Sequence, residues 1–359
     1  MINDKYVALD VDSANIVAGV YDHNGKSVIE AQIRLEKKAI EQFLSGLKGR
    51  LHVTFEEGTQ AAWLYEVIRP LASEVTVCDP RRNKLIHSGN KSDRIDVRKL
   101  GELLRLGGLR SVYHGEQSIL GLKHLVHAYD RLSSDTTKTK NRLKAVFRGR
   151  GIGCRGREIY GKNKQEEWVK KLEIEGLRTQ AELLYRQLKV HVELKGEALK
   201  EMRKEARKQP AYKLISQLPG VGKVRAAQII AATGSPHRFR TKRQYWPYCG
   251  LAVVTRSSAD YEWVGEKTRR RKKPVQTRGL NRNFNRTLKA AFKGAAKSAI
   301  KTNEEFKQYY QRMIDKHIRP EMAQLTVARK LAAIALAVWK KGEAFDPKRV
   351  NQAARTDVR

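Results

Sequence analysis

Carboxylate side chains in the N-terminal third of this sequence stand where they could bind a divalent metal ion. Asp10 and Glu57 each follow an apolar run, and Asp93 and Asp96 are three residues apart, about one turn of a helix. Carboxylates that pack together repel one another, and a hard cation removes that repulsion. Mg²⁺ prefers oxygen ligands, with Mn²⁺ as an alternative, and paired ions stabilise both the attacking and the leaving oxygen of a phosphoryl transfer. The pattern therefore predicts metal-assisted phosphodiester chemistry.

A structural role explains any single one of these acids about equally well. Asp10 could cap a turn, and Asp93 and Asp96 could cap a helix. The metal hypothesis rests on several acids standing at consistent places in one predicted domain.

The charge of the chain indicates its partner. With 73 Lys and Arg against 38 Asp and Glu, the net charge is +35, which destabilises a compact chain unless a polyanion neutralises it. Nucleic acid is the expected polyanion. The sequence has no run of 18 apolar residues and no basic N-terminal segment followed by an apolar one, so we expect a cytoplasmic protein without a membrane partner. Three cysteines without a CxxC spacing predict reduced thiols rather than a zinc site or a disulfide framework.

The elements that must position the acids are strands and helices in alternation. Asn24-Gly25 predicts a tight hairpin turn, and the next apolar runs alternate with helical patterns. Strand ends in such a sheet project into one crevice, so Asp10 and Glu57 can meet although they are far apart in sequence. We predict an α/β domain over residues 1–114 with a mixed sheet covered by helices. Its strands are expected at residues 6–9, 16–21, 27–35, 51–55 and 75–79, with helices at 39–46 and 60–71.

Residues 115–210 predict a helical connection. Two long, charged stretches, 116–147 and 166–208, carry apolar residues at helical spacing. They could form a coiled coil for self-association or a hairpin packed on its own domain, and no uninterrupted heptad decides between the two. Between them, residues 148–157 are rich in Gly and Arg, which favours a flexible backbone and phosphate contact through Arg148 and Arg150 over packing.

A mainly helical C-terminal domain is predicted over residues 211–347, followed by a frayed tail at 348–359. Leu218-Pro219-Gly220-Val221-Gly222-Lys223-Val224-Arg225 resembles a helix-hairpin-helix, in which glycines let the backbone turn and present N–H groups to phosphate. Lys223 and Arg225 would add charge there, and an αα-hairpin without a ligand is the alternative. Val224, where a phosphate-binding Walker loop needs Ser or Thr, excludes that motif.

Further basic residues are candidates for backbone contact. The run from Lys267 to Lys273 contains six Lys or Arg and is either a solvated loop or a nucleic-acid contact, and we favour the contact. The remaining predicted nucleic-acid contacts are Lys91, Arg94, Arg269, Arg270, Arg271, Lys272, Arg282 and Arg286.

Three short blocks resemble the insertion-sequence 110/1111 family of DEDD transposases: Leu9-Asp10-Val11, Glu57-Gly58-Thr59 and Asn90 to Asp96. The resemblance implies an N-terminal domain like the RuvC Holliday-junction resolvase, related to RNase H, with Asp10, Glu57, Asp93 and Asp96 as its four metal-binding acids. The usual Glu-Ala-Thr-Gly of the family stands here as Glu-Gly-Thr-Gln. Glu57 is chosen because it lies two residues before the Thr, and Glu56 is the alternative.

The same family resemblance extends into the second domain. Its Gly-Leu block matches Gly250-Leu251, and the family serine eight residues beyond that Gly matches Ser258, with Ala259 in place of the usual Gly. Ser257 is the runner-up. Taken alone, two serines in a polar stretch predict a solvated turn. The resemblance implies instead that Ser258 attacks the scissile phosphate and forms a 5′-phosphoserine link while the acids bind Mg²⁺.

The function implied by the resemblance is that of a transposase, a site-specific DNA recombinase of its own insertion element. A non-coding bridge RNA would pair with donor and target DNA, and the protein would act as a dimer that pairs into a tetramer on DNA. One rival is a metal-dependent RuvC-like Holliday-junction endonuclease that activates water and does not use the serine. The other rival is a nucleic-acid-binding protein without chemistry.

Overall fold

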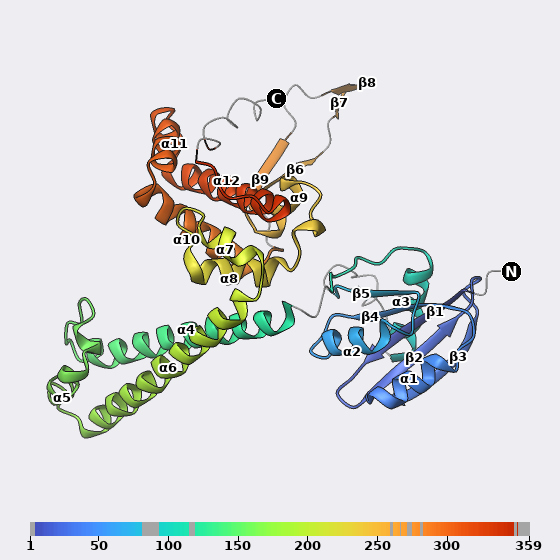
Figure 1. The fold of residues 1–359 in the computed structure, drawn as a ribbon, viewed down its shortest axis with the longest axis horizontal. Helices are drawn as coiled ribbons and strands as arrows, with labels where there is room; N and C mark the ends of the chain where they lie inside the picture. The colour runs from blue at the N-terminus through green and yellow to red at the C-terminus, as the bar shows by residue number, and fades with distance from the viewer. Residues whose placement is uncertain are drawn as a thin grey trace. The chain divides into compact units, whose positions relative to one another are not determined.

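The computed structural model describes residues 4–80, 93–114, 119–258, 261–265, 267–270, 275–280, 283–347 and 350. Helices and strands form two compact units, Met1–Gly115 and Glu116–Arg359 (Figure 1).

A five-stranded mixed sheet is the centre of the first unit, in the order β3-β2-β1-β4-β5 (Figure 1). The first three strands are antiparallel neighbours, whereas β4 and β5 run parallel to β1. The predicted mixed α/β sheet is confirmed. Its strands are β1 (Asp4–Val11), β2 (Asn15–Tyr21), β3 (Ser27–Arg34), β4 (Arg50–Glu56) and β5 (Glu74–Cys78).

Helices cover both faces of this sheet, because successive strand residues point to opposite sides. Val7 and Leu9 belong to the core shared with α1 (Lys37–Ser45) and α2 (Ala61–Ile68). Ala8, between them, belongs to a second cluster with Val97 and Leu100 of α3 (Asp93–Arg105). The sheet therefore has an α1/α2 face and an α3 face.

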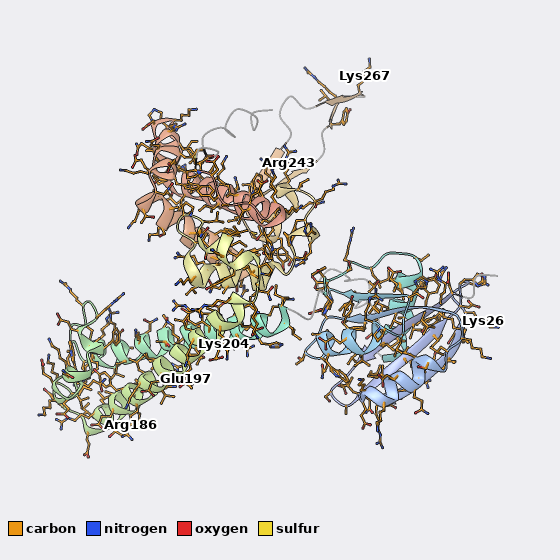
Figure 2. The ribbon with its side chains drawn as sticks, in the orientation of Figure 1. Lys26, Arg186, Glu197, Lys204, Arg243 and Lys267 are labelled. Carbon is orange, nitrogen blue, oxygen red and sulfur yellow. The ribbon has the colours of Figure 1, made fainter. Side chains whose placement is uncertain are left out.

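A helical hairpin opens the second unit. Helix α4 (Leu120–Arg148) packs along α6 (Glu175–Arg207), with short α5 (Gln165–Lys170) near the tip. The predicted helical stretch 166–208 is divided into two helices, because residues 171–174 separate α5 from α6. Charged side chains project from the outer side of α6, among them Arg186, Glu197 and Lys204 (Figure 2).

The Gly/Arg segment between α4 and α5 differs from the prediction of an unpacked backbone. Cys154 is buried in a small core with Phe147, Ile159 and Trp168. The N–H groups of Arg150 and Ile152 both donate to the Phe147 carbonyl. Apolar residues spaced among the glycines and arginines supply this core, so composition alone was a poor guide.

Helices make up most of the rest of the second unit, around one large apolar core. The predicted basic run around 267–273 begins as a strand, because Lys267–Arg270 pairs with Tyr261–Val264. The helices are α7 (Ala211–Ser216), α8 (Gly222–Thr233), α9 (Lys242–Tyr248), α10 (Arg286–Thr302), α11 (Glu304–Asp315) and α12 (Pro320–Lys341). The strands are β6 (Val253–Ser258), β7 (Tyr261–Val264), β8 (Lys267–Arg270) and β9 (Val275–Leu280).

Helix α12 is apolar because it is a core helix. Among the described residues it is the one helix whose length and composition would let it cross a membrane, with a mean hydropathy of 1.3 over its most apolar window. Half of that window is buried within the protein. Ala328, Leu331 and Ala332 are fully buried in the core against α10.

Candidate active site

Asp10 stands near the end of the central strand, on the α3 face of the sheet. Asp10 pairs with Val17 of β2, which packs against the apolar cluster formed by Ala8 and α3. Asp10 also lies two residues after Ala8 on the same strand, and therefore on the same face. The Asp10 residue is half-buried. The carboxylate thus lies at the carboxyl end of β1 on the side that α3 covers.

The two adjacent glutamates at the end of β4 face different surroundings. Glu56 pairs with Cys78 of β5, and Cys78 packs against Val97 and Leu100 of α3. The register of β1 and β4 reaches Leu9 opposite Phe55, so Asp10 and Glu56 are the next residues of the two parallel strands and share the α3 face.

Glu57 lies one residue beyond the strand and contacts a histidine instead. Its backbone N–H donates to the Cys78 carbonyl at 2.8 Å, and its Oε2 lies 2.6 Å from His114 Nε2. The His114 ring stacks on Tyr65 of α2 with ring centroids 5.2 Å apart. Glu57 therefore approaches the α2 side, where its side chain is 41% exposed.

Helix α3 contributes the other two predicted acids. Asp93 is its first residue, and its side chain lies outside the described part of the structure. Asp96 is half-buried beside Val97, and its Oδ1 atom is buried without a hydrogen-bond partner among the described residues. An acceptor oxygen in that state can take a cation as its partner.

The residues that share the α3 face have the donor chemistry of a hard-cation site. Asp10 and Glu56 on that face, and Asp96 of α3 itself, offer only carboxylate oxygens, which Mg²⁺ prefers, and the buried Asp96 Oδ1 has no hydrogen-bond partner within the described part of the chain. No group of three or more His, Cys, Asp or Glu side chains within the described residues is positioned to hold a metal ion. The Asp93 side chain is not among those residues.

The serine candidates lie in the second unit, at the end of a strand rather than in a turn. Ser258 is the last residue of β6 and pairs with Val275 of β9, and Ser257 pairs with Gln276. Their side chains lie outside the described part of the structure. Successive strand residues face opposite ways, so only one of these serines can present its hydroxyl to a given face of the ribbon.

Two glycines with positive φ form the turn between α7 and α8. Gly220 has φ of 73° and packs so closely on α10 that a Cβ atom would collide with the Ala295 carbonyl. Gly222 has φ of 61° at the start of α8 and faces open space. Lys223 is exposed beside it, whereas Arg225 donates from Nη1 to the Gly220 carbonyl at 2.7 Å. Arg225 therefore braces the turn from within.

The other predicted basic contacts lie on several surfaces. Arg94 is exposed and 3.7 Å from Glu30, and Arg148 and Arg150 are exposed at the tip of the helical hairpin. Arg269 and Arg286 are exposed at β8 and at the start of α10. Lys91, Arg271, Lys272 and Arg282, together with the side chain of Arg270, lie outside the described residues.

Sequence reasoning missed two polar residues that the fold brings into use. His114 carried no motif, and its contact with Glu57 depends on the chain returning beside β5. Asp130 of α4 accepts hydrogen bonds from Gln228 of α8 at 2.7 Å and from Thr287 of α10 at 3.3 Å. Asp130 thereby links α4 to α8, which follows the glycine turn, and to α10, on which Gly220 packs. An acid inside a charged helix gave no sequence signal for this role.

Comparison with known proteins agrees with the blocks seen in the sequence. Residues 7–150 match the DEDD transposase family of IS110, and residues 212–311 match the transposase family IS116/IS110/IS902. The chain is also similar to the transposase for insertion sequence element IS1111A of Coxiella burnetii, with 23% identity over 203 residues. That match covers 55% of this chain and 55% of the relative, so the chain spans about half the length of the curated relative. Since the two family matches together take in more than half of its residues in the expected order, the chain belongs to the IS110 family of transposases.

Proposed function

We propose that this protein is the transposase of an insertion element and acts as a site-specific DNA recombinase. The observation that carries the proposal is the pair of family matches, one over the sheet with Asp10 and one over much of the helical unit. The strand order β3-β2-β1-β4-β5, with three antiparallel strands and two parallel ones, supports a RuvC-like fold for the first unit. The glycine turn between α7 and α8 supports a helix-hairpin-helix in the second.

Asp10, Asp93, Asp96 and one glutamate would hold the divalent metal, Mg²⁺ or Mn²⁺. Motif spacing assigns the glutamate position to Glu57, whereas the sheet register favours Glu56. When bound, the metal would polarise the scissile phosphate and favour the ionised form of an attacking hydroxyl. The carboxylates themselves would fix its place at the carboxyl ends of β1 and β4.

Ser258 is the proposed nucleophile, with Ser257 as the runner-up. Its Oγ would bond to the phosphorus as the bond to the 3′ oxygen breaks, which leaves a 5′-phosphoserine and a free 3′ hydroxyl. Attack of a 3′ hydroxyl on that phosphoserine would rejoin the strand and restore the serine. The role rests on the family resemblance and on the position of Ser258 at the end of β6.

Nucleic acid and a second copy of the chain are the proposed partners. The net charge of +35 supports binding of nucleic acid. Donor and target DNA, a non-coding RNA of the element and a cytoplasmic location are proposed from the family resemblance. Leu183, Val190 and Leu194 of α6 are 55%, 50% and 42% exposed, at spacings of seven and four residues. This stripe supports self-association along the helical hairpin. The dimer, and its pairing into a tetramer on DNA, are proposed from the family resemblance.

The test is a covalent protein–DNA adduct. Purified protein is incubated with Mg²⁺, labelled donor and target DNA and the RNA of its element, and adducts are resolved under denaturing conditions. We expect an adduct with the wild type and none with Ser258→Ala or Asp10→Ala, while Ser257→Ala keeps it. An adduct that survives in Ser258→Ala and disappears in Ser257→Ala would transfer the role to the neighbouring serine.

A RuvC-like Holliday-junction endonuclease is the second candidate, because the acidic face does not by itself require a serine. Cleavage of a four-way junction without any adduct, lost in Asp10→Ala but retained in Ser258→Ala, would support that candidate. Absence of cleavage in every protein, with nucleic-acid binding intact, would mean a binding protein without chemistry.

A further inference from the structure

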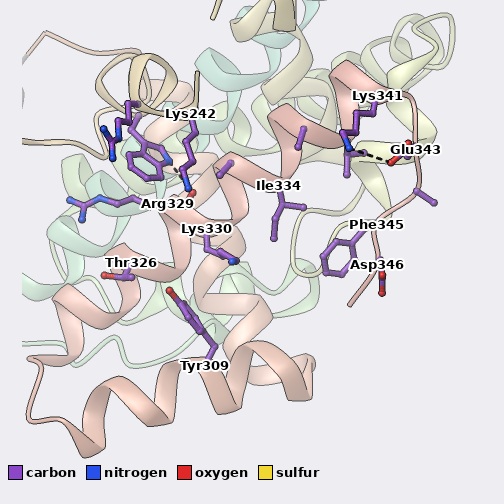
Figure 3. A pocket seen from close by; sticks show the side chains of 16 residues that line it. Lys242, Tyr309, Thr326, Arg329, Lys330, Ile334, Lys341, Glu343, Phe345 and Asp346 are labelled. Carbon is purple, nitrogen blue, oxygen red and sulfur yellow. Dashed lines mark hydrogen bonds and ion pairs between the residues drawn. The ribbon is translucent and has the colours of Figure 1, made fainter. Parts of the chain in front are cut away.

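A cavity of about 570 Å³ lies within the second unit (Figure 3). Its walls come from α9, α11, α12 and the segment that follows α12, and all of its lining residues are described. The volume falls within the roughly 300–1,000 Å³ of small-molecule sites. Neither the predicted metal-binding acids nor any residue of β6 lines this cavity.

Aromatic and apolar side chains form much of the cavity wall. Tyr309 of α11 contributes a ring and Ile334 of α12 an aliphatic side chain (Figure 3). Trp246 of α9 and Ala337 of α12 also line the wall. The Trp246 indole is held in place because its Nε1–H donates to the Arg329 carbonyl at 3.0 Å. A fixed ring beside apolar side chains is the kind of surface on which a nucleobase stacks.

Cations stand beside both rings. Lys242 Nζ lies 5.7 Å from the centroid of the Trp246 ring, and Lys330 Nζ lies 6.0 Å from that of Tyr309. The lining contains five basic residues and two acidic ones, of which Glu343 pairs with Lys341 at 4.0 Å. The excess of positive charge suits a ligand that joins a flat ring to a phosphate.

Arg329 connects the cavity to the strand that carries the proposed nucleophile. Its Nε donates to the Leu251 carbonyl at 2.6 Å, two residues before β6 begins. Its Nη2 atom is buried and has no hydrogen-bond partner among the described residues. Burial also lowers the pKa of this guanidinium from its ordinary value, which reflects an uncompensated charge.

We infer that this cavity binds an unpaired nucleotide of a nucleic-acid strand, with the base stacked on Trp246 and Tyr309 and the phosphate beside Lys242 and Lys330. The inference rests on the proposed function only in taking nucleic acid as the substrate. An unpaired nucleotide is favoured over a duplex because a base inside a duplex cannot offer its face to a ring.

The experiment compares a blunt 20-base-pair DNA duplex with the same duplex carrying a three-nucleotide overhang, by fluorescence anisotropy without Mg²⁺. Because base stacking on an aromatic ring is a strong contact, we expect the wild type to bind the overhang duplex about tenfold more tightly. Trp246→Ala and the cavity-filling Ala337→Trp should each reduce that gain to less than about twofold. Tyr309→Phe, which keeps the ring, and Trp63→Ala, which removes a 38% exposed indole of α2, should retain it.

Ala337→Trp removes no contact from the core, because Ala337 is exposed on α12, so it separates loss of the cavity from loss of the fold. Overhangs of DNA and of RNA, each placed at a 5′ or a 3′ end, show whether the unpaired nucleotide belongs to a DNA or an RNA strand. A 2-aminopurine in the overhang should lose fluorescence on binding to the wild type and not to Ala337→Trp. If no overhang tightens binding, or if the tighter binding persists in Ala337→Trp, the cavity is not the nucleotide site. Binding to the blunt duplex would in either case leave the proposed function standing. Failure to bind either duplex would reject both.

Discussion

Glu56 and Glu57 show how far a single residue step changes a side chain's surroundings. One shares the α3 face with Asp10, and the other contacts His114 near α2. The side-chain period of a strand is two, so neighbouring residues at a strand end turn to opposite faces. Motif spacing cannot resolve a pair of identical neighbours, whereas strand pairing can.

Separate substitution of the two glutamates tests this difference. We expect Glu56→Gln to reduce Mg²⁺-dependent strand cleavage at least about 100-fold, because it removes a carboxylate beside Asp10. Glu57→Gln should reduce it less than about tenfold, since it weakens a contact with His114 outside that face. Cleavage rates at saturating Mg²⁺ measure both effects, with matching thermal unfolding midpoints as the control. The reverse order would restore Glu57 to the metal site.

Buried thiols make a second prediction at the scale of single residues. Burial raises the pKa of the Cys249 thiol against the opposing effect of a hydrogen bond with Tyr245, and burial also raises that of Cys154. Only the thiolate reacts with alkylating agents, and a raised pKa keeps the thiol protonated. We expect neither residue to react with iodoacetamide at pH 8 until the protein unfolds, as peptide mass spectrometry can establish. Rapid alkylation of either in the native protein would contradict its burial.

At the scale of elements, the turn before α8 separates two glycines that look alike in the sequence. Both have positive φ, but Gly220 packs on the α10 backbone and Gly222 faces open space. The first is required by close packing as well as by its dihedral angle, and the second by its dihedral angle alone.

Replacing each glycine with alanine should therefore lower the free energy of unfolding by different amounts. Gly222→Ala should lower the free energy of unfolding by about 1 kcal/mol, from backbone strain. Gly220→Ala should lower it by about 3 kcal/mol or more, because strain is joined by a collision with rigid backbone. Urea unfolding of each variant beside the wild type supplies the comparison. Equal losses would mean that α10 moves aside without cost.

For the whole molecule, the net charge of +35 bears on the proposed binding of nucleic acid. If the protein binds DNA, release of counterions from the phosphates should supply most of the sequence-independent binding free energy. The chain's exposed cations are spread over α3, the hairpin tip, β8 and α10 rather than confined to one element. Such a distribution suits a partner larger than one short duplex.

Salt dependence measures that contribution. If six to ten phosphates are contacted, affinity for a blunt duplex should fall about 10³-fold to 10⁵-fold between 50 and 200 mM salt. Lys223→Gln should lower the slope of log affinity against log salt by about one if the glycine turn contacts phosphate. Arg225→Gln should change it less, since its guanidinium bonds within the turn. An affinity that is insensitive to salt would exclude backbone contact as the main interaction.

The sequence by itself determined the features that are local or chemical: the strands around Asp10, the mixed sheet, the long charged helices and the family. Apolar periodicity and charge are carried by neighbouring residues, so they are readable without a fold. Only the tertiary structure decided which glutamate lies beside Asp10, that Cys154 packs the hairpin tip, and that Trp246, Tyr309 and Arg329 enclose one cavity. Those facts depend on strand register and on contacts between residues far apart in the chain, which no local pattern encodes.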